Sequence, residues 1–189
     1  TQVDVELPGN NALPVRIART WSTAAPEGPT APGLFGEWEL DLPVMHGVFG
    51  RGAAGGWRVN TATPFNRCSV AADTDVEPGP VTNRDGAFGG DEYWRGNFLS
   101  VPGAGDQQLL YRVGTYTKKP NDGQSYPWVT PSHWQLRCLP ALANGQPGEG
   151  FVALAPDGTQ YTFDWLVTRE YSTLNRPYSV EVAYGETKT

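Results

Sequence analysis

Apolar and polar residues alternate in short runs along this chain, and this period of two constrains the fold more than any other feature. In the segment 3–7, three aliphatic residues are separated by two acidic ones, and Tyr161 and Phe163 alternate with polar residues in the same way. Successive side chains of a β-strand point to opposite faces, so the pattern predicts half-buried strands. No window of 11 or more residues has the spacing of an amphipathic helix. We therefore expect an all-β chain, with antiparallel hairpins forming a curved sheet or a sandwich-like single domain over residues 1–189.

Turn residues divide these runs into hairpins, since the chain contains 23 Gly and 17 Pro. The clearest hairpin has Phe151–Leu154 as one arm, Asp157-Gly158 at the turn and the aromatic run 161–165 as the other arm. Gly supplies the positive φ that a tight turn needs. A second strand–turn–strand unit is expected over residues 3–21. Further strands are expected at 34–43, 93–94, 98–101, 109–116, 134–139 and 178–184, and a long exposed loop at 73–90.

The charge distribution argues against nucleic-acid binding, and the lack of a long apolar run argues against membrane insertion. The net charge is −6, and the only adjacent basic residues are Lys118 and Lys119. A nucleic-acid-binding protein presents a basic stripe, so we expect no nucleic-acid partner. No apolar run approaches the ~18 residues of a membrane span, so we expect no membrane insertion. Because the sequence starts at Thr1 and shows no signal-peptide pattern, we expect a processed or excised fragment.

The two cysteines, Cys68 and Cys138, are 70 residues apart, which excludes a Cys-x-x-Cys redox or zinc motif. In an oxidising compartment they could form a disulfide. Two buried free thiols fit the sequence as well, and both alternatives remain open at this point.

Two other patterns resemble chemical sites. Residues Gly50–Gly55 match GxGxxG, but strand-like sequence follows instead of a helix, so a flexible turn is expected rather than a dinucleotide site. The acidic residues Asp73, Asp75 and Glu77 alternate like calcium ligands, but Pro78 and Arg84 occupy the positions at which an EF-hand needs Gly and Glu. We expect a solvated loop there, and no cofactor or metal.

The only histidines are His46 and His133. His133 precedes Cys138 by five residues, but no third orienting group or oxyanion hole is visible for a Cys–His dyad. Both are expected to be hydrogen-bonded surface or semi-buried imidazoles. We therefore predict no catalytic residue and no enzymatic activity.

The chain contains seven tryptophans, which could stack on carbohydrate or fill a core. Five of them lie in or beside the alternating runs, so we expect mainly structural use: Trp38, Trp57, Trp94, Trp134 and Trp165.

Three segments together resemble the start of the core of RHS (YD-repeat) proteins. The first comprises residues 3–9, 13–15 and the Arg-Thr-Trp-Ser ending 19–22. The second is 33–38, in which Glu37 stands where the family commonly has Gly. The third is the Pro-Asp-Gly hairpin 155–163. Their order also fits, and the resemblance spans positions 3 to about 165.

The resemblance implies a non-catalytic structural module of a bacterial toxin-delivery protein, in which the module contributes to or caps the β-shell around a C-terminal toxin. The implied partners are the remainder of the shell, the toxin cargo and the secretion apparatus. The implied location is outside the bacterium, for example through type VI secretion, after folding in the cytoplasm. The alternative is a carbohydrate- or cell-surface-binding β-module of a secreted protein, which an exposed row of aromatic rings would favour.

Overall fold

The computed structural model describes residues 1–7, 15–21, 38–49, 66–70, 80–83, 86–114, 118–167 and 174. Within this part of the chain, 43% of the structure is strand and 4% is helix, and all strand pairs are antiparallel. The expected all-β fold is therefore confirmed. No helix in the described segments is long and apolar enough to span a membrane.

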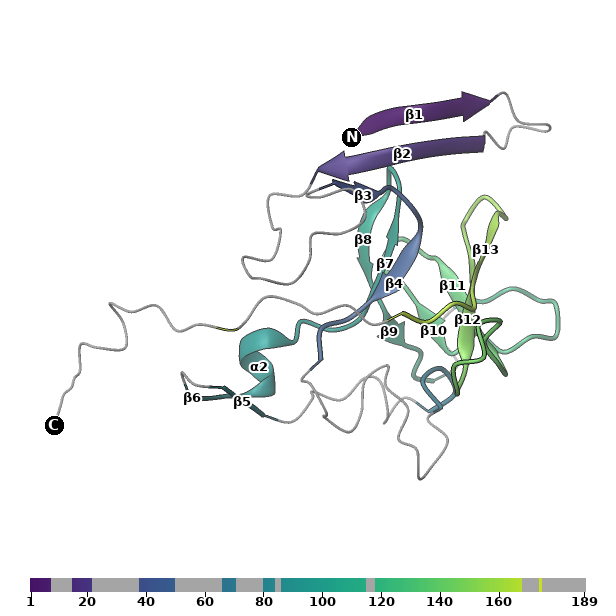
Figure 1. Ribbon diagram of the computed structural model, residues 1–189. Helices are drawn as coiled ribbons and strands as arrows, with labels where there is room; N and C mark the ends of the chain where they lie inside the picture. Colours follow the sequence, from purple (N-terminus) through teal and green to yellow (C-terminus); the bar gives the residue numbers. More distant parts are fainter. Residues whose placement is uncertain are drawn as a thin grey trace, which may run out of the picture.

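The largest sheet has five strands in the order β13-β12-β11-β10-β9, so each strand pairs with its neighbour in the sequence (Figure 1). This up-and-down order is what short turns between antiparallel strands produce. The strands are β9 (Leu110–Tyr111), β10 (Trp128–Val129), β11 (Gln135–Leu139), β12 (Gly150–Leu154) and β13 (Gln160–Phe163).

The β12–β13 hairpin forms as the sequence predicts, with Leu154 opposite Gln160 and Ala153 opposite Tyr161. Gly158 has φ +92°, a backbone conformation that L-residues rarely adopt. The turn is closed by two main-chain hydrogen bonds, in which Ala155 N–H donates to Thr159 O at 2.8 Å and Gly158 N–H donates to Ala155 O at 2.9 Å.

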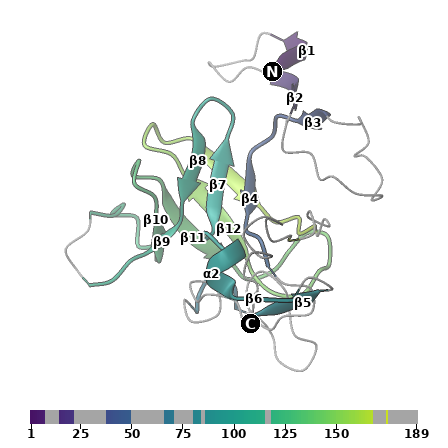
Figure 2. The same ribbon diagram turned by 90° about the vertical axis from the view of Figure 1, so that its left-hand side faces the viewer.

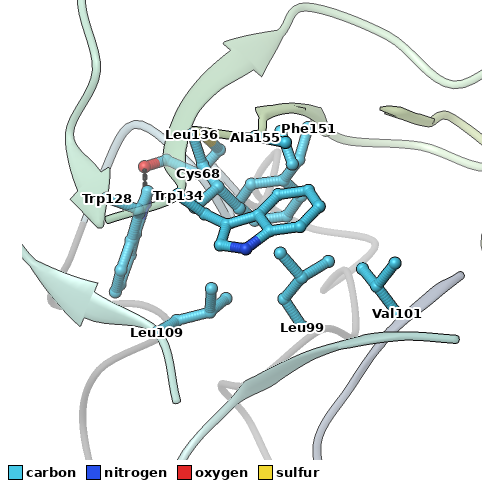
Figure 3. Close-up of a cluster of buried hydrophobic side chains, with 10 residues drawn as sticks. Cys68, Leu99, Val101, Leu109, Trp128, Trp134, Leu136, Phe151 and Ala155 are labelled. Carbon is cyan, nitrogen blue, oxygen red and sulfur yellow. Dashed lines mark hydrogen bonds between the residues drawn. The ribbon is translucent and has the colours of Figure 1, made fainter. Parts of the chain in front are cut away.

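A three-stranded sheet packs against the five-stranded one and completes the core. It consists of β4 (Val44–His46), β7 (Phe98–Val101) and β8 (Gly105–Gln108) in the order β4-β7-β8 (Figure 2). Figure 3 shows Leu99, Val101 and Leu109 facing Trp134, which directly precedes β11, and Phe151 of β12. Leu99 and Leu136 are fully buried, which is the close packing expected between the faces of two sheets.

The prediction of a long exposed loop at 73–90 is wrong for the described residues 80–83 and 86–90. Strands β5 (Val81–Asn83) and β6 (Gly86–Phe88) form a small hairpin, and helix α2 (Gly90–Tyr93) follows. Phe88 is buried, so this segment belongs partly to the interior. Strands of three residues are too short to show a period of two in the sequence, which explains the error.

A strand was also expected at 93–94, and this prediction is wrong because Tyr93 ends helix α2. The Glu92 carboxylate accepts the Gly89 N–H at 2.7 Å, which satisfies a backbone donor that the first turn of a helix leaves free. One helical turn therefore replaces the expected strand.

The N-terminal strands form a separate three-stranded sheet, β1 (Gln2–Leu7), β2 (Val15–Trp21) and β3 (Trp38–Leu40). In Figures 1 and 2 this sheet lies apart from the two packed sheets. The pairing register shifts between Val3 and Val5, so β1 contains a bulge near Asp4. The expected strand–turn–strand unit over 3–21 is confirmed at 3–7 and 15–21, whereas residues 8–14 and the expected strand at 178–184 lie outside the described residues.

Candidate functional site

Two of the sequence motifs considered above lie outside the described residues. They are the glycine-rich segment Gly50–Gly55 and the acidic residues Asp73, Asp75 and Glu77. Among the residues that the structure does describe, no three His, Cys, Asp or Glu side chains come together as metal ligands would.

His46 lies at the end of β4 on the protein surface. Its Nε2 is 3.6 Å from an Asp106 carboxylate oxygen, and its ring stacks on Phe98 with 5.6 Å between centroids. His133 lies in the turn between β10 and β11 and has φ +68°. Its N–H donates to Thr130 O at 2.9 Å, which closes the turn.

Cys68 and Cys138 form a disulfide in the structure, with 5.5 Å between their Cα atoms. A cysteine in a disulfide offers no thiolate, so His133 and Cys138 cannot act as a nucleophile–base pair in this state. Cys68 lies in the turn 67–69. Cys138 lies within β11, as expected.

The segment around Cys68 is held by polar contacts from residues about 80 positions away. One Glu149 carboxylate oxygen accepts the Cys68 N–H at 2.9 Å and the Ser69 N–H at 2.8 Å. Arg67, which is buried, donates to the main-chain carbonyls of Glu149 at 2.7 Å and Pro147 at 2.8 Å. We call these contacts, together with the Trp128 bond described next, the Cys68 clamp.

Trp128 supplies the third part of the clamp, because its indole N–H donates to the Cys68 carbonyl at 2.8 Å within the core (Figure 3). Both main-chain polar groups of Cys68 are therefore satisfied although the residue has no exposed surface. Burial lowers the pKa of Arg67, and the nearby charge of Glu149 acts in the opposite direction. No local sequence pattern signals the clamp, because its partners are far apart in the chain.

A pocket of about 350 Å³ lies beside the disulfide. It is lined by Ser69, Tyr111, Gln124, Ser125, Pro127, Arg137 and Cys138. Cys138, unlike Cys68, is only partly buried. The pocket therefore gives solvent a route to one side of the disulfide.

The wall of this pocket is fixed by hydrogen bonds. Asp122 accepts the Gln124 N–H at 3.0 Å and the Tyr126 hydroxyl at 2.7 Å. The Gln124 bond and then the Tyr126 bond lower the pKa of Asp122, because both stabilise the ionised carboxylate. Arg112 donates to the Tyr126 carbonyl at 2.8 Å and also to the Gln135 side chain. The segment 122–127 is thereby tied to the sheet.

The N-terminal sheet carries the second notable surface. Cross-strand partners share a face, and here Val5 pairs with Ile17 and Trp21 with Trp38. Side chains two positions apart in a strand also share a face, which places Leu7 beside Val5. Leu40 lies on this face because it is opposite Arg19, which is two positions from Ile17 in β2. Its exposed large apolar side chains, which we call the N-terminal apolar face, are Val5, Leu7, Ile17, Trp21, Trp38 and Leu40.

One charged pair lies among these apolar side chains. Arg19 donates from Nε and Nη2 to the two Asp4 carboxylate oxygens at 2.6 and 2.7 Å. This bidentate bond lowers the pKa of Asp4 and raises that of Arg19. The Arg19 guanidinium also lies over the Trp38 ring, 5.5 Å from its centroid.

The tryptophan prediction is partly wrong. Trp134 is buried in the core and Trp94 is partly buried, but Trp165 is 69% exposed and Trp38 is 36% exposed. Strand β13 ends at Phe163, so Trp165 has left the sheet that was expected to bury it. Trp38 lies on the N-terminal apolar face, whose large apolar side chains are all exposed. Trp57 lies outside the described residues.

Comparison of this chain with protein-family models, with curated proteins and with solved structures found no match.

Proposed function

We propose that this chain is a non-catalytic structural module of a bacterial RHS-type toxin-delivery protein, in which it contributes to or caps the β-shell around a C-terminal toxin. Its partners are then the rest of the shell, the enclosed toxin and the secretion apparatus. The protein folds in the cytoplasm and is exported afterwards, for example by type VI secretion.

The N-terminal apolar face is the observation that carries this proposal. Six large apolar side chains are at least 36% exposed on one face of a small sheet. Sheets normally bury one apolar face, and a clustered exposed patch marks a surface that another element covers. In a shell, the following strands of the same wall supply that cover.

The surroundings of the two histidines and of Cys138 also support a structural role. His46 pairs with a carboxylate on the surface, His133 closes a turn, and Cys138 is in a disulfide. None of these groups is arranged with a nucleophile, a base and an orienting group, which acyl or phosphoryl transfer by side chains requires.

The proposal is tested on the full-length gene product that contains this chain, with its toxin inactivated. Electron microscopy should show a hollow particle, and the toxin should resist added protease. The substitution Ile17→Asp places a charge on the apolar face, so it should raise the rate of toxin cleavage about tenfold or more, because burying an unpaired charge is costly.

Glu6→Gln is the matched control, since Glu6 pairs with Arg16 on the opposite face of the same strands. It should leave the cleavage rate unchanged. A solid particle, or equal protection in wild type and Ile17→Asp, contradicts the shell role.

A second candidate function, binding of carbohydrate at a cell surface, is favoured by one observation. Trp21 and Trp38 are direct cross-strand neighbours, and their side chains are 51% and 36% exposed. Adjacent exposed indole rings offer an apolar platform for sugar rings, and Arg19 with Asp4 provides polar groups beside it.

A glycan array with the isolated chain separates the two functions. Binding that disappears in Trp21→Ala but persists in Trp165→Ala favours the carbohydrate role, since Trp165 is exposed but follows β13 and does not belong to the N-terminal sheet. No binding in the wild type, combined with a hollow full-length particle, favours the shell.

A further inference from the structure

We propose that the pocket beside Cys138 is a port at which a small disulfide compound of the glutathione class exchanges with the cysteine pair of the folded protein. The inference is independent of the shell role. It rests on the unequal surroundings of the two cysteines and on the clamp that holds one of them.

The clamp holds Cys68 in place without the disulfide. Glu149 accepts the Cys68 N–H, Trp128 donates to the Cys68 carbonyl, and Arg67 joins the same turn to two carbonyls that lie just before β12. Cys138 is held separately, because it pairs with Phe151 in the β11–β12 ladder. We therefore expect both sulfurs to stay close together after reduction, so that the bond can open and close in the folded chain.

The two cysteine residues differ in exposure. Cys68 has no exposed surface, whereas Cys138 is partly buried and borders the pocket. The pocket volume of about 350 Å³ lies within the range of small-molecule sites, roughly 300–1,000 Å³. An incoming compound therefore reaches Cys138 and not Cys68.

The lining suits a charged, peptide-like disulfide. Ser69, Gln124 and Ser125 offer hydrogen-bonding groups, and Arg137 offers a cation to the carboxylates of oxidised glutathione. Asp122 is an acidic residue near Arg137, whose charge contributes to lowering the pKa of Asp122. Its carboxylate is already occupied by Gln124 and Tyr126.

The exchange is balanced with oxidised glutathione as the oxidant. The Cys138 thiolate attacks one glutathione sulfur, forms a mixed disulfide and releases one glutathione thiolate. The Cys68 thiolate then attacks the Cys138 sulfur, forms the protein disulfide and releases the second glutathione. The two cysteines lose two protons and two electrons, and the oxidant becomes two molecules of glutathione. The reverse reaction reduces the pair.

The first experiment identifies the sulfur that is attacked. Reduced wild type is treated with a limiting alkylating agent without denaturant, and mass spectrometry then locates the label. Cys138 should be labelled before Cys68, and near-UV circular dichroism should stay native. Equal labelling, or loss of the near-UV signal on reduction, overturns the proposal.

The second experiment tests the port with oxidised glutathione. Ser125→Trp fills the pocket and should slow disulfide formation in the reduced folded protein about tenfold. Ser132→Trp is the matched control, since Ser132 is an exposed serine in the β10–β11 turn away from the pocket lining, and it should oxidise at the wild-type rate. Equal rates in the two variants overturn the port.

The third experiment traps the intermediate. Cys68→Ser should accumulate a mixed disulfide at Cys138, whereas Cys138→Ser should leave Cys68 unmodified under native conditions. Modification of Cys68 at a comparable rate overturns the order of attack. Because the alkylation experiment uses the wild-type chain, the proposal stays testable if either serine variant fails to fold.

Discussion

Trp128 donates its indole N–H to the Cys68 carbonyl oxygen at 2.8 Å, although the two residues are 60 positions apart. Trp128 is also 1% exposed and belongs to the hydrophobic core between the sheets. One side chain thus joins the Cys68 turn to the core by both a hydrogen bond and apolar contact.

Replacing this residue by Phe removes the donor and part of the ring. We expect Trp128→Phe to lower the free energy of unfolding by about 3 kcal/mol, because the Cys68 carbonyl stays buried without a partner and a cavity forms. Urea denaturation measures the change. Trp165→Phe is the control, since an exposed ring should change stability by less than about 0.5 kcal/mol. Similar losses in both variants would contradict the role assigned to Trp128.

The β12–β13 turn depends on the left-handed backbone of Gly158. A Cβ atom at this position would have no other atom within 4 Å, so steric crowding would not explain a loss of stability. We expect Gly158→Val to lower the free energy of unfolding by about 1 kcal/mol or more, because a β-branched residue resists positive φ. Gly158→Asn should cost less, since Asn tolerates this region. A thermal melt of Gly158→Val that matches the wild type would argue against a strained turn.

The sequence predicted these hairpins well because their signals are local. The apolar run of β12, the alternation in β13 and the Asp-Gly turn between them lie within 14 consecutive residues, Gly150–Phe163. The same holds for the arms of β1 and β2. A period of two is visible only where a strand is long enough to repeat it.

The Cys68 clamp and the exposure of individual tryptophans could not be predicted from the sequence, because they depend on contacts between residues that are far apart in the chain. The Cys68 clamp joins Arg67 and Cys68 to Glu149, about 80 residues away. The exposure of Trp165 depends on where β13 ends, and that of Trp38 on whether another layer covers its sheet. Such tertiary outcomes follow from packing rather than from propensity.

His133 is the only non-glycine residue with positive φ in the described part of the chain. Left-handed backbone costs an L-residue roughly 1–2 kcal/mol, and Gly avoids this cost but loses more entropy on folding. We therefore expect His133→Gly to raise the free energy of unfolding by about 0.5 kcal/mol. The neighbouring substitution Ser132→Gly lacks this relief and should not stabilise the protein. Chemical denaturation of both variants measures the difference, and a loss of stability in His133→Gly would contradict the strain.

Acid should weaken the β12–β13 turn through Asp157. Its carboxylate accepts the Thr159 N–H at 2.9 Å, and this backbone bond followed by the Thr159 hydroxyl lowers the pKa of Asp157. A folded-state pKa below the unfolded one means that the ionised carboxylate favours folding. The contribution is present above the ordinary carboxyl pKa of about 4, and it is lost as the pH falls through the lower folded value.

Asp157→Asn tests this linkage, because the amide oxygen can still accept the Thr159 N–H but does not titrate. We expect the variant to lose less stability than the wild type between about pH 4 and pH 2, measured by urea denaturation at each pH. Glu6→Gln serves as the control, since Glu6 is an exposed carboxylate in β1 outside the turn, and the variant should lose stability in parallel with the wild type. If Asp157→Asn and the wild type lose stability in parallel, the carboxylate does not stabilise the turn.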